Sequence, residues 1–184
     1  FFYPLVVGHS YYKADYFLHR ESYDSFLLMH ICKGNCIVSS REEIFRVSAG
    51  QTVLLNCYSP HAYYSDREEW EALWLHFDGP VAHGYYEYII QKCSLTITHE
   101  NPIEFVSGLY RLYQQFCKGA AIREALASEQ ITQLLTSLTL TGETGRKGNL
   151  SRGIIEESIA YIREHLCEDS LSLETLSTQA NLSR

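Results

Sequence analysis

The sequence has few basic residues and no long apolar run. It contains 15 Lys and Arg against 22 Asp and Glu, which gives a formal net charge of −7. A nucleic-acid-binding surface concentrates basic side chains that displace counterions from phosphates, and no stretch of this sequence does so. No apolar run approaches the roughly 20 residues of a membrane helix. We therefore expect neither specific DNA binding by these 184 residues nor a membrane span.

Familiar signatures of enzymes and disulfide scaffolds are also missing. The six cysteines show no CxxC pair and none of the density of a secreted scaffold, so free thiols in a reducing cytoplasm are expected. There is no GxSxG, GxGxxG, HExxH or P-loop motif. The chain begins with Phe1 rather than Met, which indicates a trimmed start. The sequence thus predicts a cytoplasmic protein that is not an enzyme.

Residues 1 to about 78 have the pattern of short β-strands. Turn signals, such as the KGN at 33–35, separate apolar or alternating runs at 25–32, 36–40, 43–50, 52–57 and 70–77. Short strands with a turn roughly every eight to ten residues are typical of a small antiparallel barrel or sandwich.

After the DGP at 78–80 the apolar period becomes helical. Helices are expected at 81–93, 101–119 and 120–140, the last two as an antiparallel hairpin. The third helix has an apolar stripe of Ile122, Leu126, Leu134, Leu135 and Leu138, with Ala125 and Ile131 alongside. Two interpretations remain open: the hairpin covers one side of the barrel, or its stripe pairs with a second copy of the chain.

The last part of the sequence indicates a linker and two further helices. Residues 141–151 hold three glycines among polar residues, which is linker composition. Residues 152–169 are strongly amphipathic, and 172–180 form a short helix followed by a turn at 181–183. The predicted organisation is a first domain at 1–140, a linker at 141–151 and the start of an all-α domain at 152–184.

The stretch WEALWLHF at 70–77 is the best candidate for a binding surface. As a strand it places Trp70, Ala72, Trp74 and His76 on one face. Aromatic rings beside an imidazole are typical of a site that stacks and hydrogen-bonds a small polar ligand such as a sugar. The alternative is that this face packs the barrel interior, with His76 bonded to backbone.

A metal site inside the barrel is not expected. The stretch AGQTVLLNCYSPHAYYS at 49–65 resembles the second conserved motif of cupins, in which a histidine joins an earlier HxH and Glu around a metal. Here the earlier stretch offers His30, Glu42 and Glu43 but no HxH. Three histidines on neighbouring strands, His30, His61 and His76, could still converge, but only His61 is at a motif position. A metal ion needs about three or four ligands, so we expect His61 to form hydrogen bonds near the barrel mouth instead. A metal-dependent cupin enzyme acting on a small polar substrate stays as the alternative.

Several stretches together resemble the AraC-type transcription regulators of bacteria. The C-terminal SIAYIREHLCEDSLSLETLSTQANLSR is similar to the start of that family's DNA-binding domain. The N-terminal YDSFLLMHICKGNC, AGQTVLLNCYSPHAYY and WEALWLHFDGP resemble its effector-binding and dimerisation domain, in the form common among Gram-positive regulators of sugar use. The resemblance implies an α+β chain: a cupin-like antiparallel β-barrel, a helical hairpin, a linker, and an incomplete helix-turn-helix domain cut before its recognition helix.

Local matches to the family's ligand-contacting stretches imply site residues. LVVGHS points to Ser10, DYFLHR to Arg20, PHAYY to Tyr63 and WLHF to Trp74, while His76 is added from strand parity alone. Another sugar-contacting position of the family falls on Ala72, so the identity of the sugar does not follow from the resemblance.

The resemblance implies a ligand-responsive transcription regulator, either an activator or a repressor, without cofactor or metal. We expect this chain to bind a small-molecule effector, a sugar, and to form a homodimer through the 102–140 helices. DNA is expected to be a partner of the full-length protein but not a specific partner of this fragment. A dimerisation module that no longer binds a ligand is a further alternative.

Overall fold

The structure is a computed structural model that describes residues 1–99, 102–117 and 123–141. The chain separates into two compact units, Phe1–Gly142 and Glu143–Arg184, and the described residues belong to the first. The expected helices and turn of the 152–184 domain lie outside the described residues, as does nearly all of the expected linker.

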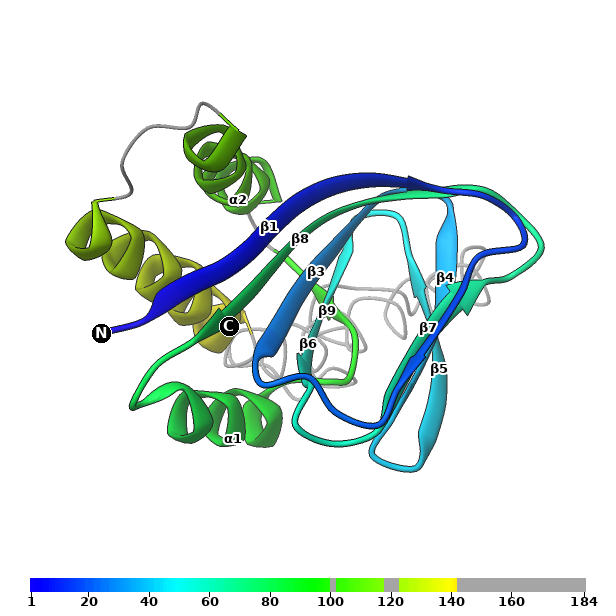
Figure 1. Ribbon diagram of the computed structural model, residues 1–184, viewed down its shortest axis with the longest axis horizontal. Helices are drawn as coiled ribbons and strands as arrows, with labels where there is room; N and C mark the ends of the chain where they lie inside the picture. The colour runs from blue at the N-terminus through cyan, green and yellow to red at the C-terminus, as the bar shows by residue number, and fades with distance from the viewer. Residues whose placement is uncertain (100–101, 118–122, 142–184) are drawn as a thin grey trace, which may run out of the picture. The chain divides into compact units, whose positions relative to one another are not determined.

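Two antiparallel sheets face each other in the described part of the chain (Figure 1). The five-stranded sheet has the order β1-β8-β3-β6-β9 and the four-stranded sheet the order β2-β7-β4-β5. The strands of the first sheet are β1 (Tyr3–Tyr12), β3 (Phe26–Lys33), β6 (Gln51–Asn56), β8 (Trp70–Asp78) and β9 (Ile97–Thr98). Those of the second are β2 (Phe17–Arg20), β4 (Asn35–Ser40), β5 (Glu43–Ser48) and β7 (His61–Ser65). The expected cupin-like barrel is thereby confirmed in a coarser form, as an antiparallel β-sandwich with helices.

Helices lie on the outer face of the five-stranded sheet. They are α1 (Ala82–Lys92), α2 (Pro102–Cys117) and a helix over 124–141, close to the ranges expected from the sequence. In Figure 1, α2 lies beside β1 and β8, which it contacts, and α1 lies beyond the end of β8. No helix in the described ranges is long and apolar enough to cross a membrane.

The third helix buries a stripe that differs in part from the expected one. Its buried apolar residues are Ala127, Ile131, Leu134, Leu135 and Leu138. Leu126, which we expected in the stripe, is 38% exposed, and Ala125 is exposed. The buried positions follow an i, i+4, i+7, i+8 spacing, which puts residues 125 and 126 beside the contact face rather than on it. Ile122 lies outside the described residues.

Two hydrophobic cores lie on the two faces of the five-stranded sheet. The inner core fills the space between the sheets and contains Leu27, Met29, Val38, Val53 and Trp70 among others. The outer core lies between the sheet and the helices, and contains Phe26, Leu28, Leu75, Phe105 and Leu135 among others. Strand β8 contributes to both, because side chains along a strand alternate between faces. The helical hairpin therefore covers one side of the sandwich, as one of the two interpretations expected.

Candidate ligand-binding site

Strand β8 presents its polar and aromatic side chains to the space between the sheets. Trp70, Ala72 and Trp74 belong to or pack against the inner core, whereas Leu73 and Leu75 belong to the outer core. His76 shares the parity of Trp74, and the two rings meet edge to face with centroids 5.6 Å apart. The parity prediction for this strand is therefore confirmed.

The indole of Trp74 is held in place by strand β1. Its Nε1–H donates a hydrogen bond of 3.0 Å to Oγ of Ser10. Its six-membered ring lies against Gly8, where a Cβ would overlap ring atoms. Both Trp74 and Ser10 are only partly buried. A large aromatic surface is thus fixed by one hydrogen bond and one close backbone approach while part of it stays accessible.

His76 is buried and held by two neighbours. Its Nδ1 lies 2.8 Å from Oγ of Ser25, and its ring meets that of Tyr23 edge to face at 4.9 Å. Burial, followed by the positive charge of Arg20, lowers the pKa of His76 to about 4. The imidazole is therefore neutral at pH 7 and can either accept or donate a hydrogen bond. The alternative that His76 bonds to backbone is not what the structure shows.

Arg20 brings a positive charge to the same place from the end of β2. Its guanidinium carbon lies 4.6 Å from the centroid of the Tyr23 ring, which is within cation–π distance. After burial, its charge is a further cause of the lowered pKa values of His76 and His61. Arg20 is partly buried. Five donors on a fixed planar group therefore lie beside two neutral imidazoles.

Tyr63 lies deeper, in a wall of aromatic rings. It is 7% exposed, and its ring stacks with that of Tyr16 at 6.2 Å between centroids. Tyr12 stacks on Trp70 at 3.9 Å, and Tyr16 packs against Tyr12 at 4.5 Å. Burial raises the pKa of the Tyr63 hydroxyl well above its ordinary range, so the phenol stays protonated. The structure thus brings Ser10, Arg20, Tyr63, Trp74 and His76 to one inner surface, linked through Tyr16 and Tyr23.

His61 belongs to the same surface and was not among the predicted site residues. Its Nδ1 donates to the carbonyl of Ser59 at 2.9 Å, because a carbonyl oxygen can only accept. Nε2 is therefore an acceptor, and it is buried without a hydrogen-bond partner among the described residues. A buried acceptor in this state is a position that a bound hydroxyl would satisfy. The signal in the sequence was parity, since His61 shares the face of Tyr63.

The three histidines considered for a metal do not converge. His30 lies on the outer face, where Nδ1 is 2.9 Å from Oγ1 of Thr52, which is itself 2.7 Å from Nε2 of His99. His61 and His76 lie on the inner face. The hypothesis of a three-histidine metal site in the barrel is therefore wrong for these residues.

Solved structures with some similarity to this chain include a protein of unknown function and two transcriptional regulators. The conserved SPY1581 protein from Streptococcus pyogenes is 20% identical with a TM-score of 0.37, covering 40% of this chain and 63% of its own. An HTH_3 family transcriptional regulator from Vibrio cholerae is 12% identical with a TM-score of 0.38, covering 40% and 42%. The Cupin_2 domain of an XRE family transcriptional regulator from Enterobacter cloacae is 15% identical with a TM-score of 0.35, covering 44% and 96%. The chain thus spans under two thirds of the first two of these proteins. No curated protein matches it.

A match over most of the first unit defines the family. The family model described as the AraC-like ligand-binding domain matches residues 3–136, which is well over half of the chain. The matched range runs from the first strand to the third helix and includes every residue of the inner surface described above. This chain belongs to the family of AraC-like ligand-binding domains.

The contact between Gly8 and Trp74 gives a prediction for the inner surface. We expect Gly8→Ala to displace the indole, to destabilise the fold by about 1 to 3 kcal/mol through overpacking, and to make Trp74 more accessible to acrylamide quenching. Gly84→Ala is the matched control, because a Cβ there meets nothing within 4 Å and alanine favours the helix by roughly 0.5 to 1 kcal/mol. Equal urea midpoints and quenching for both variants would contradict the account of Trp74.

Proposed function

We propose that this chain binds a small polar molecule, a sugar or sugar derivative, between the two sheets against Trp74. The observation that carries the proposal is the partly exposed indole, which Ser10 and Gly8 hold and the neutral imidazole of His76 borders. The guanidinium of Arg20 lies over the Tyr23 ring on the other side of that imidazole. Membership of a ligand-binding domain family supports a small-molecule effector. The more specific assignment of the effector as a sugar rests on the chemistry of the surface.

The groups on this surface suit the two sides of a sugar. The C–H face of a pyranose or furanose lies flat on an indole such as Trp74, and the aromatic wall excludes water from that contact. The hydroxyls need donors and acceptors close to the ring. Arg20 offers donors, and Nε2 of His61 offers a buried acceptor that has no partner among the described residues. A large apolar ligand would leave these polar groups unsatisfied, which costs binding free energy.

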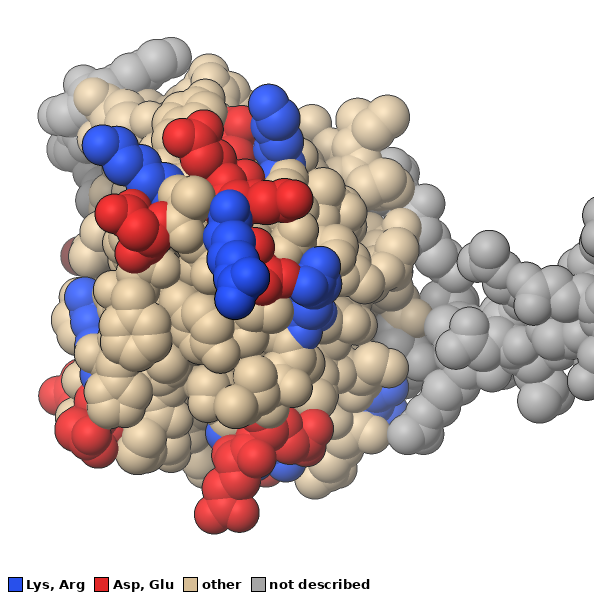
Figure 2. All heavy atoms as spheres, turned by 90° about the vertical axis from the view of Figure 1, so that its right-hand side faces the viewer, with Lys and Arg blue, Asp and Glu red and all other residues tan. Residues whose placement is uncertain are grey.

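The effector would act as the signal for a transcription regulator. We infer that binding favours one of two arrangements of the parent protein and so sets where its DNA-binding domains lie. DNA contact belongs to a helix-turn-helix domain of the full-length protein. The face in Figure 2 supports this division, because acidic and basic side chains are interspersed over it and do not form a continuous basic surface. A net charge of −7 disfavours phosphate binding by the chain as a whole.

A carbohydrate panel in isothermal titration calorimetry tests the proposal. We expect at least one sugar or sugar phosphate to bind, and Trp74→Ala and Arg20→Ala each to weaken it by about tenfold or more, since each removes a contact of roughly 1 to 3 kcal/mol. Arg46→Ala is the matched control, because its guanidinium pairs with Asp66 and is largely exposed. If the sugar binds equally well after Trp74→Ala and Arg20→Ala, the assignment of the binding site to the space between the sheets is contradicted.

We also propose that the chain forms a homodimer through the 102–140 helices. Both helices bury one stripe in the outer core, yet they keep further apolar side chains in solvent. On α2, Ile103 is 79% exposed and Tyr110 is 42% exposed, and on the third helix Leu126 is 38% exposed. Such a surplus apolar face is characteristic of an association surface.

Sedimentation velocity tests the dimer. We expect a dimer that Ile103→Glu weakens by about tenfold or more, because the change places a charge in an apolar contact. Ile44→Glu is the control, since Ile44 is 70% exposed on β5 of the other sheet. A monomeric wild type at high concentration, or equal weakening by both changes, would contradict the assignment of the interface to these helices.

A further inference from the structure

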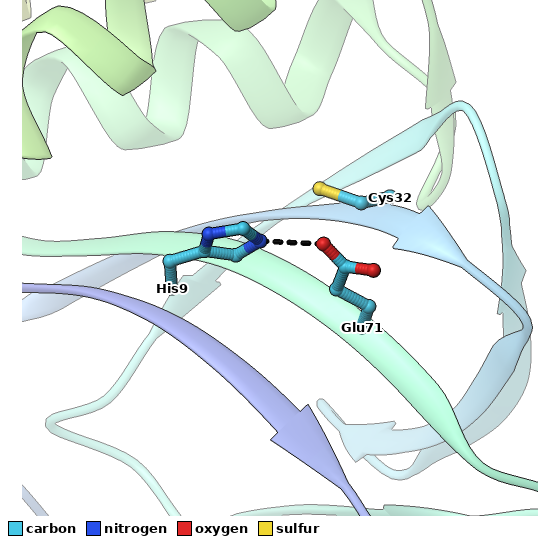
Figure 3. Close-up of side chains that lie close together, drawn as sticks. All are labelled: His9, Cys32 and Glu71. Atoms are coloured by element: carbon cyan, nitrogen blue, oxygen red, sulfur yellow. Dashed lines mark hydrogen bonds and ion pairs between the residues drawn. The ribbon is translucent and has the colours of Figure 1, made fainter.

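On the outer face of the five-stranded sheet, three potential metal ligands from three neighbouring strands lie together. His9 comes from β1, Glu71 from β8 and Cys32 from β3, and β8 runs between the other two strands. One ligand atom of each lies within 4.8 Å of the others. Figure 3 shows the Cys32 sulfur beside the pair formed by the His9 ring and the Glu71 carboxylate.

Strand alternation places Cys32 in this group. Ile31 lies in the inner core, so the side chain of its neighbour Cys32 is on the outer face, beside Glu71. The pairing of β3 with β8 is irregular at this point: Ile31 pairs with Ala72 and Lys33 pairs with Glu71, so Cys32 is the extra residue of a β-bulge. Bulges are over-represented beside functional sites.

Two of the three side chains already form a short hydrogen bond with each other. Nε2 of His9 lies 2.6 Å from Oε1 of Glu71, with a proton between the two atoms. In a metal site, a cation bound to both atoms would take the place of that proton. Around a tetrahedral zinc ion, ligand atoms at 2.0 to 2.3 Å from the metal lie about 3.5 Å from one another. The three ligand atoms, all within 4.8 Å of one another, are therefore close to that spacing, and small side-chain rotations would adjust them to it.

Contacts from α2 fix the orientation of the His9 ring. The His9 ring is held edge to face by Tyr110 and Tyr113 of α2, at 6.4 and 5.9 Å between centroids. Such outer contacts orient a ligand ring before metal arrives.

We propose that His9, Cys32 and Glu71 form a binding site for a zinc ion on the outer face of the sheet. Imidazole nitrogen, thiolate sulfur and carboxylate oxygen are the three donor types that zinc takes in proteins. A soft thiolate disfavours magnesium and calcium, which select oxygen donors. Three protein ligands leave a fourth position for water or a solute. The side chains of His9 and Glu71 remain 23% and 21% exposed, which gives the ion a path of entry.

This site is separate from the inner surface, although both use β8. Glu71 points to the outer face and its chain neighbours Trp70 and Ala72 to the inner one. A bound ion would link β1, β8 and β3 at one point. Zinc binding is therefore expected to stabilise the first unit whether or not the inner surface takes a sugar.

Cobalt substitution tests the site in the full 184-residue chain. We expect stoichiometric Co²⁺ to give the visible absorption of a four-coordinate ion and a sulfur-to-cobalt charge-transfer band in the near ultraviolet, both removed by Zn²⁺. Cys32→Ser should abolish the charge-transfer band. His9→Gln and Glu71→Gln should each weaken zinc by about 100-fold or more, because loss of even an outer partner of a ligand costs about 10- to 100-fold.

Two variants serve as matched controls. Cys117→Ser removes an exposed thiol at the end of α2, and His19→Gln removes a surface histidine 3.8 Å from Glu21. Both should bind cobalt as wild type does, and circular dichroism should show every variant folded. If one ligand variant fails to fold, the other two still decide. Absence of cobalt binding, a charge-transfer band that persists in Cys32→Ser, or an equal loss in Cys117→Ser would overturn the proposal.

Discussion

Strand β8 is buried on both faces, and the rest of the structure depends on how its side chains alternate. One face supplies Leu73, Leu75 and Phe77 to the core beneath the helices. The other supplies Trp70 and Ala72 to the core between the sheets, with Trp74 and His76 beside them. A shift of one residue in its pairing with β1 or β3 would exchange the two faces and put the indole under the helices. The register of β8 is thus the constraint that positions the inner surface.

The same constraint separates two kinds of chemistry on one strand. The inner face joins a fixed indole to a neutral imidazole and a guanidinium, which suits a polar ligand with an apolar face. The outer face is apolar over most of its length, but at Glu71 it meets a histidine from β1 and a thiol from β3. Both proposed sites take residues from β1 and β8, which are neighbours in the sheet.

Much of this arrangement could be predicted from the sequence, and the reasons are local. Alternation in WEALWLHF predicted which side chains of β8 share a face, and the helical period after residue 80 predicted α1 within a residue or so of its ends. Ser10, Arg20 and Tyr63 followed only from resemblance to a family, whereas Trp74 followed from both the resemblance and the alternation. The structure brings them together, and their role in binding stays a prediction. The helix-turn-helix segment lies outside the described residues.

What the sequence did not show depends on pairing between distant strands. Strand β1 is 10 residues long, contains Gly8 and has apolar residues on both faces, so its sequence shows only weak alternation between apolar and polar residues. The need for a glycine at position 8 becomes clear only from the pairing with β8, which places the Trp74 ring against Gly8. The free acceptor of His61 depends on a turn carbonyl, and the grouping of His9, Cys32 and Glu71 depends on the strand order β1-β8-β3 and its register. Our assignment of Leu126 to the buried stripe was wrong, because the apolar period of a helix defines the width of the stripe better than the residues at its edges.

The most direct test of the account is to follow the indole N–H resonances by NMR during titration with an effector. The chain has only two tryptophans, and each N–H has a different partner: Ser10 for Trp74 and Ser65 for Trp70. Our account predicts that a binding sugar shifts the Trp74 resonance strongly and the Trp70 resonance far less, since Trp70 is buried in the core. A sugar that binds while the Trp74 resonance stays unmoved would contradict the central claim that the ligand lies between the sheets against this ring.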